Sequence, residues 1–312
     1  MTAVDFFSAS RVLIVAGKGG VGKTTVGATI GIAAARAGLR THIVELEGRS
    51  NLGIPFGVEE LTHRPATLIE PTSSTGRLRG SRLTPDQALG DYLVDHGLRI
   101  GGRLAKFSAI ELITTTAPGI RDLLTLGKIR SLEESDEDDL IVVDAPAAGH
   151  AISFLRAAAG MASSAPSGPI REQADHALAM LGDEARSRVM LVTLPEETPV
   201  TELIETAFTI EDEVGVHLAP VVVNSVWPEI KGLEKAAGET GKRANEARDN
   251  RRTAAEYRLA RQQQQRSEID RLAAGLPLPQ IELPFVFTTD LGRSDLDLLA
   301  DVLIDQAEAL RP

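Results

Sequence analysis

One glycine-rich stretch near the N-terminus holds the residues best able to do chemistry. It reads Gly17-Lys18-Gly19-Gly20-Val21-Gly22-Lys23-Thr24-Thr25. Glycine allows sharp turns that bring backbone N–H groups against an anion, and the N-terminus of a following helix adds a partial positive charge. Lys23 can reach the outer phosphates of a nucleotide, and the Thr24 hydroxyl can bind Mg²⁺. The stretch predicts a phosphate-binding loop formed by Gly19, Gly20, Val21, Gly22, Lys23, Thr24 and Thr25.

The elements on either side of this loop have the order that the chemistry needs. The apolar run 12–16 is too short and too β-branched for a helix, so it predicts a strand. A helical pattern follows at 25–37, with Thr25 as its first residue. A glycine-rich turn with no ligand is the alternative, but the full Gly-x4-Gly-Lys-Thr spacing after a strand is rare by chance.

A second candidate lies far downstream, where the apolar run 140–144 ends in Asp144. Many buried strands end in an aspartate, but one that follows a phosphate loop can hold a Mg²⁺-bound water. Asp144 therefore joins Thr24 in the expected metal site. The acidic run 133–139 is interpreted as a solvated loop, and residues 145–148 as a loop that senses the outer phosphate.

The rest of the chain must supply the scaffold. It has 312 residues, of which 43% are hydrophobic and only 4% aromatic, and this favours an aliphatic core in a parallel sheet covered by helices. The segments 40–46, 189–194 and 220–224 predict further strands. We expect an α/β P-loop NTPase with a mostly parallel, doubly wound sheet. The expected organisation is one domain over 1–312, with an α-helical insertion at about 85–135 and 151–186 and a polar helical segment at about 232–274.

Composition argues against several classes of protein. The net charge of −11 disfavours a broad nucleic-acid-binding surface, which needs a basic face. The chain has no cysteine, and this excludes disulfides, thiolate zinc sites and iron–sulfur clusters. The sequence shows neither a signal peptide nor an apolar run of about 18 residues, so the cytoplasm is the expected compartment.

Several segments together resemble the family of arsenite-pump and tail-anchored-protein-targeting ATPases, also called anion-transporting ATPases. Lys18 matches the signature lysine of deviant Walker A ATPases. Asp144-Ala145-Pro146-Ala147-Ala148-Gly149-His150 is similar to the family's Asp-Thr-Ala-Pro-Thr-Gly-His segment, and 193–202 resemble its loop after the next strand. The resemblance implies ATP and Mg²⁺ as cofactors, Lys18 and Lys23 as catalytic residues, and a dimer in which Lys18 reaches the partner's nucleotide.

The resemblance extends to the side of the site that would hold the base. At Asn224 the family has an asparagine that hydrogen-bonds adenine, and Pro284 and Phe285 resemble the segment that packs on the base. An amide can pair with the N6 and N7 edge of adenine, so this role is chemically sensible. The alternative is that Asn224 is a turn residue at a strand end.

Two departures from the family pattern matter. Where the family has Asp-Pro-Ala-His-Asn-Leu, this chain has Glu47-Gly48-Arg49-Ser50-Asn51-Leu52. Glu47 is expected to position the attacking water, with Glu45 as the substitute. The extra methylene predicts slow hydrolysis, because a misplacement near 1 Å can cost about a hundredfold. The absent cysteines remove the metalloid site and the Cys-x-x-Cys zinc clasp, so we expect no zinc.

Three functions fit these features. The favoured hypothesis is a switch driven by ATP binding and hydrolysis, a homodimer or a heterodimer with a paralogous subunit, that presents its helical insertion to a membrane-protein client or transporter partner. The second is a cell-division or partition-type positioning ATPase, which would need a basic membrane helix or a DNA-binding face. The acidic terminal helix after Ser294 disfavours that function. The third is a nucleotide-binding scaffold without turnover.

Overall fold

A mostly parallel sheet forms the centre of the molecule. The computed structural model describes residues 1–46, 52–95, 119–238 and 246–310. Its strands are β1 Val12–Gly17, β2 Thr41–Glu45, β3 Ala66–Ile69, β4 Leu78–Arg82, β5 Leu140–Ala147, β6 Ser187–Thr193, β7 Val221–Val226 and β8 Gln280–Pro284. Across the sheet they run β3-β4-β2-β5-β1-β6-β7-β8, and only β3 and β4 pair antiparallel. The expected α/β class with a mostly parallel sheet is confirmed.

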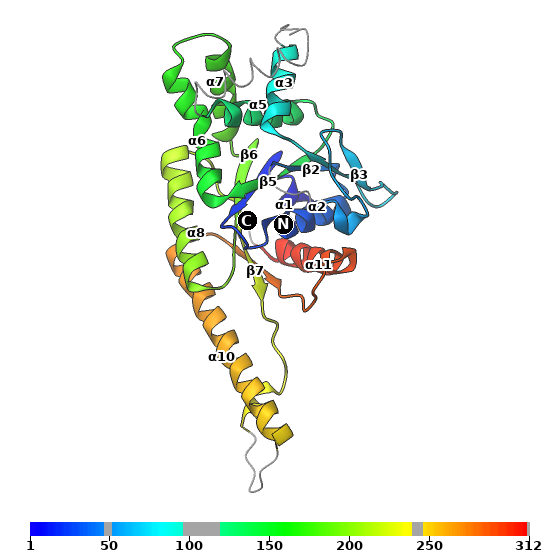
Figure 1. Ribbon diagram of the computed structural model, residues 1–312. Helices are drawn as coiled ribbons and strands as arrows, with labels where there is room; N and C mark the ends of the chain where they lie inside the picture. Colours follow the sequence, from blue (N-terminus) through cyan, green and yellow to red (C-terminus); the bar gives the residue numbers. More distant parts are fainter. Residues whose placement is uncertain (47–51, 96–118, 239–245, 311–312) are drawn as a thin grey trace.

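Helices cover both faces of this sheet, as expected for a doubly wound fold (Figure 1). In the described ranges they are α1 Ala3–Phe7, α2 Lys23–Arg36, α3 Pro85–Asp95, α5 Ile120–Glu134, α6 Ala148–Ser164, α7 Pro169–Leu181, α8 Glu197–Thr209, α9 Leu233–Ala237, α10 Glu246–Gly275 and α11 Arg293–Ala309. Buried side chains of α1, α2 and α11 share one core cluster with the sheet, and those of α6, α8 and α10 share the other. The phosphate loop therefore lies between a central strand and a helix that is packed on both sides.

Strand β1 shows how the sequence produces this arrangement. Its side chains alternate between the faces of the sheet, so Val12 and Ile14 join the cluster of α6 and α8, while Leu13 and Val15 join that of α2 and α11. Both faces are buried, which is why the strand reads as an unbroken apolar run. Each buried aliphatic side chain stabilises the fold by roughly 1.5–3 kcal/mol. The phosphate loop therefore begins at the end of a strand that is fully buried.

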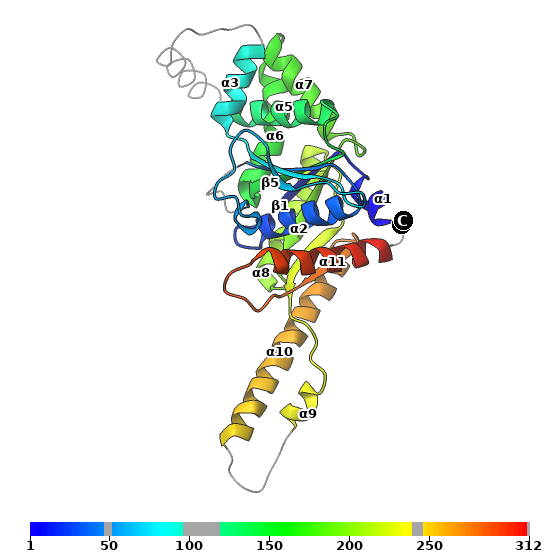
Figure 2. The same ribbon diagram turned by 90° about the vertical axis from the view of Figure 1, so that its right-hand side faces the viewer.

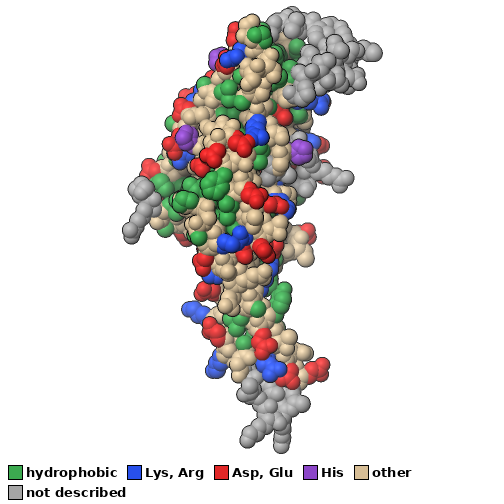
Figure 3. All heavy atoms as spheres, turned by 90° about the vertical axis from the view of Figure 1, so that its left-hand side faces the viewer, with side chains coloured by type: hydrophobic (Ala, Val, Ile, Leu, Met, Phe, Trp, Pro, Cys, Tyr) green, Lys and Arg blue, Asp and Glu red, His purple; other side chains and the backbone are tan. Residues whose placement is uncertain are grey.

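Two groups of helices extend beyond the sheet at opposite ends. Helices α3, α5, α6 and α7 pack together at one end, and α10 projects from the other end beside the short α9 (Figures 1 and 2). Over the face at the left of Figure 1, acidic and basic side chains are interspersed along the length of the molecule (Figure 3). The structure describes no helix that is long and apolar enough to cross a membrane. The boundaries of the helical insertion and of the polar segment stay predictions.

The acidic run 133–139 is held at the sheet and is not simply a solvated loop, so that prediction is wrong for its two buried members. Glu133 and Asp138 are only 6% and 5% exposed. Arginines at the starts of several strands and in β4 pair with the run, namely Arg11, Arg40, Arg77, Arg79 and Arg186. Sequence alone could not show this, because the arginines lie in four separate segments of the chain.

Asp138 is the member of this cluster with the largest expected effect on stability. Burial raises its pKa, but the contacts of His42 and Arg79 with its carboxylate outweigh burial and lower the pKa to about 2. The His42 Nδ1 atom is 3.5 Å from the carboxylate, so that contact is electrostatic more than a well-formed hydrogen bond. A carboxyl whose pKa is depressed in the folded state stabilises the protein above its ordinary pKa and loses that effect as pH falls.

We therefore expect Asp138→Asn to lower the free energy of unfolding by about 2 kcal/mol at pH 7, and by about half as much at pH 3. Urea unfolding at the two pH values measures this. Asp136→Asn is the matched control, because Asp136 is exposed and its ion pair with Arg11 is worth at most about 1 kcal/mol. An equal loss for Asp138→Asn at both pH values would contradict the expected role of its charge.

Candidate nucleotide-binding site

The phosphate loop joins β1 to α2 as the sequence predicts, but the helix begins at Lys23, not Thr25. Gly22 precedes it with φ of 91° and Gly20 has φ of 87°, and both values lie in the left-handed region that favours glycine. Gly19 and Gly20 are exposed. Because Lys23 is the first residue of the helix, it lies at the positive end of the helix dipole, where an anion binds.

Lys23, Thr24 and Asp144 come together at this helix terminus. The Thr24 hydroxyl donates a hydrogen bond to Asp144 Oδ2 at 2.6 Å, and Lys23 Nζ donates to the Lys18 carbonyl at 3.3 Å. Burial lowers the pKa of Lys23, and the Asp144 charge opposes that shift. Burial raises the pKa of Asp144, against the Thr24 hydrogen bond and the Lys23 charge. Both groups therefore pay a desolvation cost in their charged forms. A bound phosphate near Lys23 and a bound cation near Asp144 would offset that cost.

The oxygen atoms at this point suit Mg²⁺. Asp144 is 7% exposed, and in the part of the chain that the structure describes its Oδ1 atom is buried without a hydrogen-bond partner. Magnesium prefers hard oxygen ligands and usually keeps several waters and phosphate oxygens. The Thr24 hydroxyl and the Asp144 carboxylate thus fit the expected metal site.

Two glutamates were candidates for positioning water, and the structure describes one of them. Glu45 is the last residue of β2 and pairs in register with Asp144 on the neighbouring strand, so both side chains leave the sheet on the same face. Glu45 is 2% exposed. Glu47 lies outside the described residues, in the segment 47–51, so its role stays a prediction.

The segment after Asp144 differs from its predicted form. Residues 145–148 were expected to form a loop, but β5 continues to Ala147 and α6 begins at Ala148. Ala147 pairs with Gly17 at the start of the phosphate loop. The last residue of β5 therefore lies beside the first residue of the phosphate loop, and α6 begins immediately after it. Proline and small residues hid this extension, because they give no strand pattern in the sequence.

Of the three residues expected to hold the base, Asn224 contacts the phosphate loop. Asn224, in β7, is 7% exposed, and its Nδ2 donates a hydrogen bond to the Val21 carbonyl at 3.0 Å. A Cβ added to Gly22 would overlap this amide, so the close contact needs glycine. Pro284 pairs with Val226 across β7 and β8, and the Phe285 N–H donates to the Val226 carbonyl at 2.8 Å. Pro284 and Phe285 thus lie beside the end of β7, two residues beyond Asn224, which itself contacts the loop.

Lys18 forms an ion pair with Glu202, a residue for which the sequence predicted no role. Its Nζ lies 2.5 Å from Glu202 Oε1 of α8, and both side chains are 42% exposed. Glu202 stands at the end of the segment 193–202 that matched the family pattern, but nothing in the sequence linked it to Lys18. An exposed ion pair is worth at most about 1 kcal/mol, so this contact can open at little cost.

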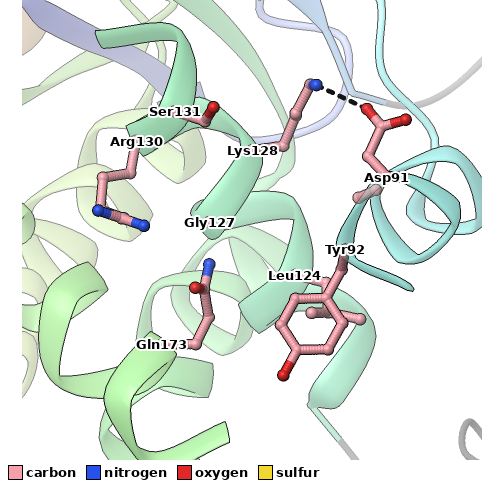
Figure 4. A pocket seen from close by; sticks show the side chains of 9 residues that line it. Asp91, Tyr92, Leu124, Gly127, Lys128, Arg130, Ser131 and Gln173 are labelled. Atoms are coloured by element: carbon pink, nitrogen blue, oxygen red, sulfur yellow. Dashed lines mark ion pairs between the residues drawn. The ribbon is translucent and has the colours of Figure 1, made fainter. Parts of the chain in front are cut away.

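A separate cavity of about 200 Å³ lies among α3, α5 and α7 (Figure 4). Its charged lining residues are all paired: Lys128 with Asp91 at 2.6 Å inside the cavity, and Arg130 with Glu134, which lies outside the lining, at 2.8 Å. It shares no residue with the phosphate loop or the base side. We therefore assign it no part in nucleotide binding.

Comparison with known proteins finds a matching family and several relatives. The family model described as anion-transporting ATPase matches residues 10–165. The chain is 32% identical over 243 residues to the ATPase BagA of Mycobacterium tuberculosis, covering 74% of this chain and 70% of that protein. It is 27% identical to arsenical pump-driving ATPases of Escherichia coli and Acidiphilium multivorum, covering 69% and 72% of this chain but only 35% and 41% of those proteins.

Proposed function

The chain belongs to the anion-transporting ATPase family, and from this premise we propose that it is a Mg²⁺-dependent ATPase that works as a dimeric switch for a membrane-protein client or transporter partner. The family supports ATP binding and hydrolysis. The magnesium requirement, the dimer, the client and a cytoplasmic location are our additions. The observation that carries the proposal is the hydrogen bond between Thr24 and Asp144 beside Lys23, at the end of the phosphate loop.

Each residue of the site has a distinct task in this function. The loop N–H groups and Lys23 would hold the phosphates, and Thr24 with Asp144 would hold the cation. Bound Mg²⁺ would neutralise part of the triphosphate charge. Asn224, Pro284 and Phe285 would hold the base. Catalysis of phosphoryl transfer is mostly positioning and charge stabilisation, so a rigid loop is what the reaction needs.

Lys18 links the nucleotide to the proposed dimer. In the single chain it is engaged by Glu202, so it must leave that carboxylate to reach a nucleotide in a partner subunit. The pair is half-exposed, and its loss is offset by a charge-assisted contact with phosphate, which is the stronger interaction. The exchange would make pairing of subunits depend on ATP. The second subunit is either a second copy or a paralogous chain.

We expect Lys18→Ala to remove ATP-dependent pairing and to lower turnover by about a hundredfold or more, because a cation supplied across an interface acts on transition-state charge. Glu202→Ala is the matched variant: it removes the same ion pair but leaves the lysine free, so turnover is expected to persist. Light scattering with and without Mg·ATP, together with phosphate release, measures both effects. If the two variants lost turnover equally, Lys18 would matter only through Glu202, and the proposed role would be wrong.

The structure also bears on the two alternatives. Helix α11 buries its apolar residues Leu296, Leu299 and Leu303 against the core, and its Asp297 and Asp301 pair with an arginine of α2. It is therefore committed to the fold, and this counts against a membrane-docking role of the positioning type. A scaffold without turnover would bind ATP and release no phosphate in the same assay.

A further inference from the structure

Helix α10 is rich in polar side chains, many of them exposed, but the amide side chain of Gln265 in this helix is buried. Gln265 ends a run of four glutamines, 262–265, and it is 3% exposed while Gln263 and Gln264 are exposed. A buried amide must find hydrogen-bond partners, because an unpaired one is costly. Both of its partners lie in residues 225–228, which are the last two residues of β7 and the two that follow it. We call this segment the Ser225 turn, because Ser225 has a positive φ there.

The two ends of the Gln265 amide hold this turn from opposite directions. Its Oε1 accepts a hydrogen bond from the Trp227 N–H at 2.9 Å, and its Nε2 donates to the Ser225 carbonyl at 3.3 Å. Ser225 has φ of 63°, in the left-handed region that a residue other than glycine rarely adopts. Such a conformation persists only where surrounding contacts impose it. Gln265 supplies one contact to Ser225 itself and one to Trp227, two residues later.

Other side chains of α10 reinforce the same turn. Arg258 and Gln262 each donate to the Pro228 carbonyl, at 2.9 Å and 2.8 Å. The Arg258 guanidinium also lies 4.2 Å from the centre of the Trp227 ring. The turn is therefore clamped by one helix over four residues, 225–228.

These contacts from α10 reach β7 on the face of the sheet opposite to the phosphate loop. Helix α10 packs in the cluster that contains Val223, whereas α2 and the phosphate loop pack in the cluster that contains Val222. Asn224 shares the face of Val222, and its amide rests on Val21. The position of Asn224 is thus set by the loop on one face and, through Ser225, by Gln265 on the other.

The chemistry of the Asn224 amide makes its orientation matter for base selection. With one N–H on Val21, it retains a carbonyl oxygen and a second N–H, which match the N6 donor and N7 acceptor of adenine. The corresponding edge of guanine presents two acceptors and would face the carbonyl oxygen unpaired. If the Asn224 amide were rotated, its carbonyl oxygen and N–H would no longer distinguish adenine from guanine.

We propose that Gln265 is a positioning residue for base selection: by clamping Ser225 and Trp227 it fixes the Asn224 amide, so that the site prefers ATP over GTP. The inference rests on the proposed ATPase function and adds its specificity. It assigns to α10, through one buried side chain that acts on Asn224, an indirect influence on which nucleotide binds.

The test compares Gln265→Glu and Gln265→Ala with the exposed control Gln264→Ala, using full-length protein. KM and kcat are measured with ATP and with GTP, and melting temperature reports folding. Gln265→Glu keeps the acceptor for Trp227 but cannot donate to Ser225. We expect both Gln265 variants to raise the KM for ATP and to lower the ATP-to-GTP ratio of kcat/KM by about tenfold, with kcat for ATP little changed. Gln264→Ala should match the wild type.

The outcomes separate the two levels of the argument. An unchanged ATP-to-GTP ratio in a folded Gln265 variant, even with a lower melting temperature, overturns the positioning role and leaves the ATPase proposal intact. If Gln265→Ala does not fold, the nearly isosteric Gln265→Glu decides the question. A wild-type protein that binds neither nucleotide overturns the proposed function and this inference together.

Discussion

Lys23→Ala is expected to lower kcat/KM for ATP by about a hundred- to a thousandfold, which is typical for the loss of one charge stabiliser at a phosphoryl-transfer site. The side chain lies at the N-terminus of α2, where the helix dipole and the loop N–H groups already favour a phosphate. Its amine is half-buried, and burial lowers its pKa, so an approaching phosphate gains from pairing with it in a poorly solvated place.

Phosphate release and calorimetry with Mg·ATP measure this effect. Lys23→Arg tests whether charge alone is enough, because the larger planar guanidinium keeps the charge but not the compact shape of the amine. Lys235→Ala in α9 is the control, since Lys235 is exposed and far from the loop. Turnover of Lys23→Ala within about threefold of the wild type would rule out the phosphate-binding role.

Asp144→Asn is expected to raise the Mg²⁺ concentration needed for half-maximal turnover by at least about tenfold, and to lower turnover at saturating Mg²⁺ by about a hundredfold. Asparagine can still accept the hydrogen bond from Thr24, so the change isolates the charge. Burial raises the pKa of Asp144, which means that its ionised form costs stability at neutral pH. The variant should therefore be at least as stable as the wild type.

Magnesium titrations of phosphate release test this prediction, with urea unfolding to confirm stability. Glu47→Gln is the informative comparison, because a residue that positions water should lower turnover without shifting the magnesium requirement. Glu45→Gln, on the strand beside Asp144, identifies the substitute if Glu47→Gln has no effect. An unshifted magnesium requirement in Asp144→Asn would mean that the cation is held elsewhere.

The sequence alone predicted the fold class of this protein, which the structure confirms, and the residues of its candidate phosphate loop. Consecutive residues specify the phosphate loop, because the glycines, Lys23 and Thr24 act through a single turn between a strand and a helix. The candidate role of Asp144 could be predicted because the apolar run 140–143 and this carboxylate are contiguous, although β5 continues to Ala147. The apolar runs 12–16, 140–143 and 189–192 predicted a parallel sheet, because strands covered on both faces read as continuous apolar runs.

What depends on residues far apart in the chain was decided only by the tertiary structure. The pairs Lys18 with Glu202, Gln265 with Ser225 and Trp227, and Asp138 with Arg79 join segments separated by 184, 40 and 38, and 59 positions. Strand β4, Leu-Arg-Gly-Ser-Arg, has no continuous apolar pattern, because Arg79 pairs with Asp138 of the acidic run and Arg82 pairs with Glu60. Local patterns record burial, but the partner of a polar side chain is chosen when distant segments pack together.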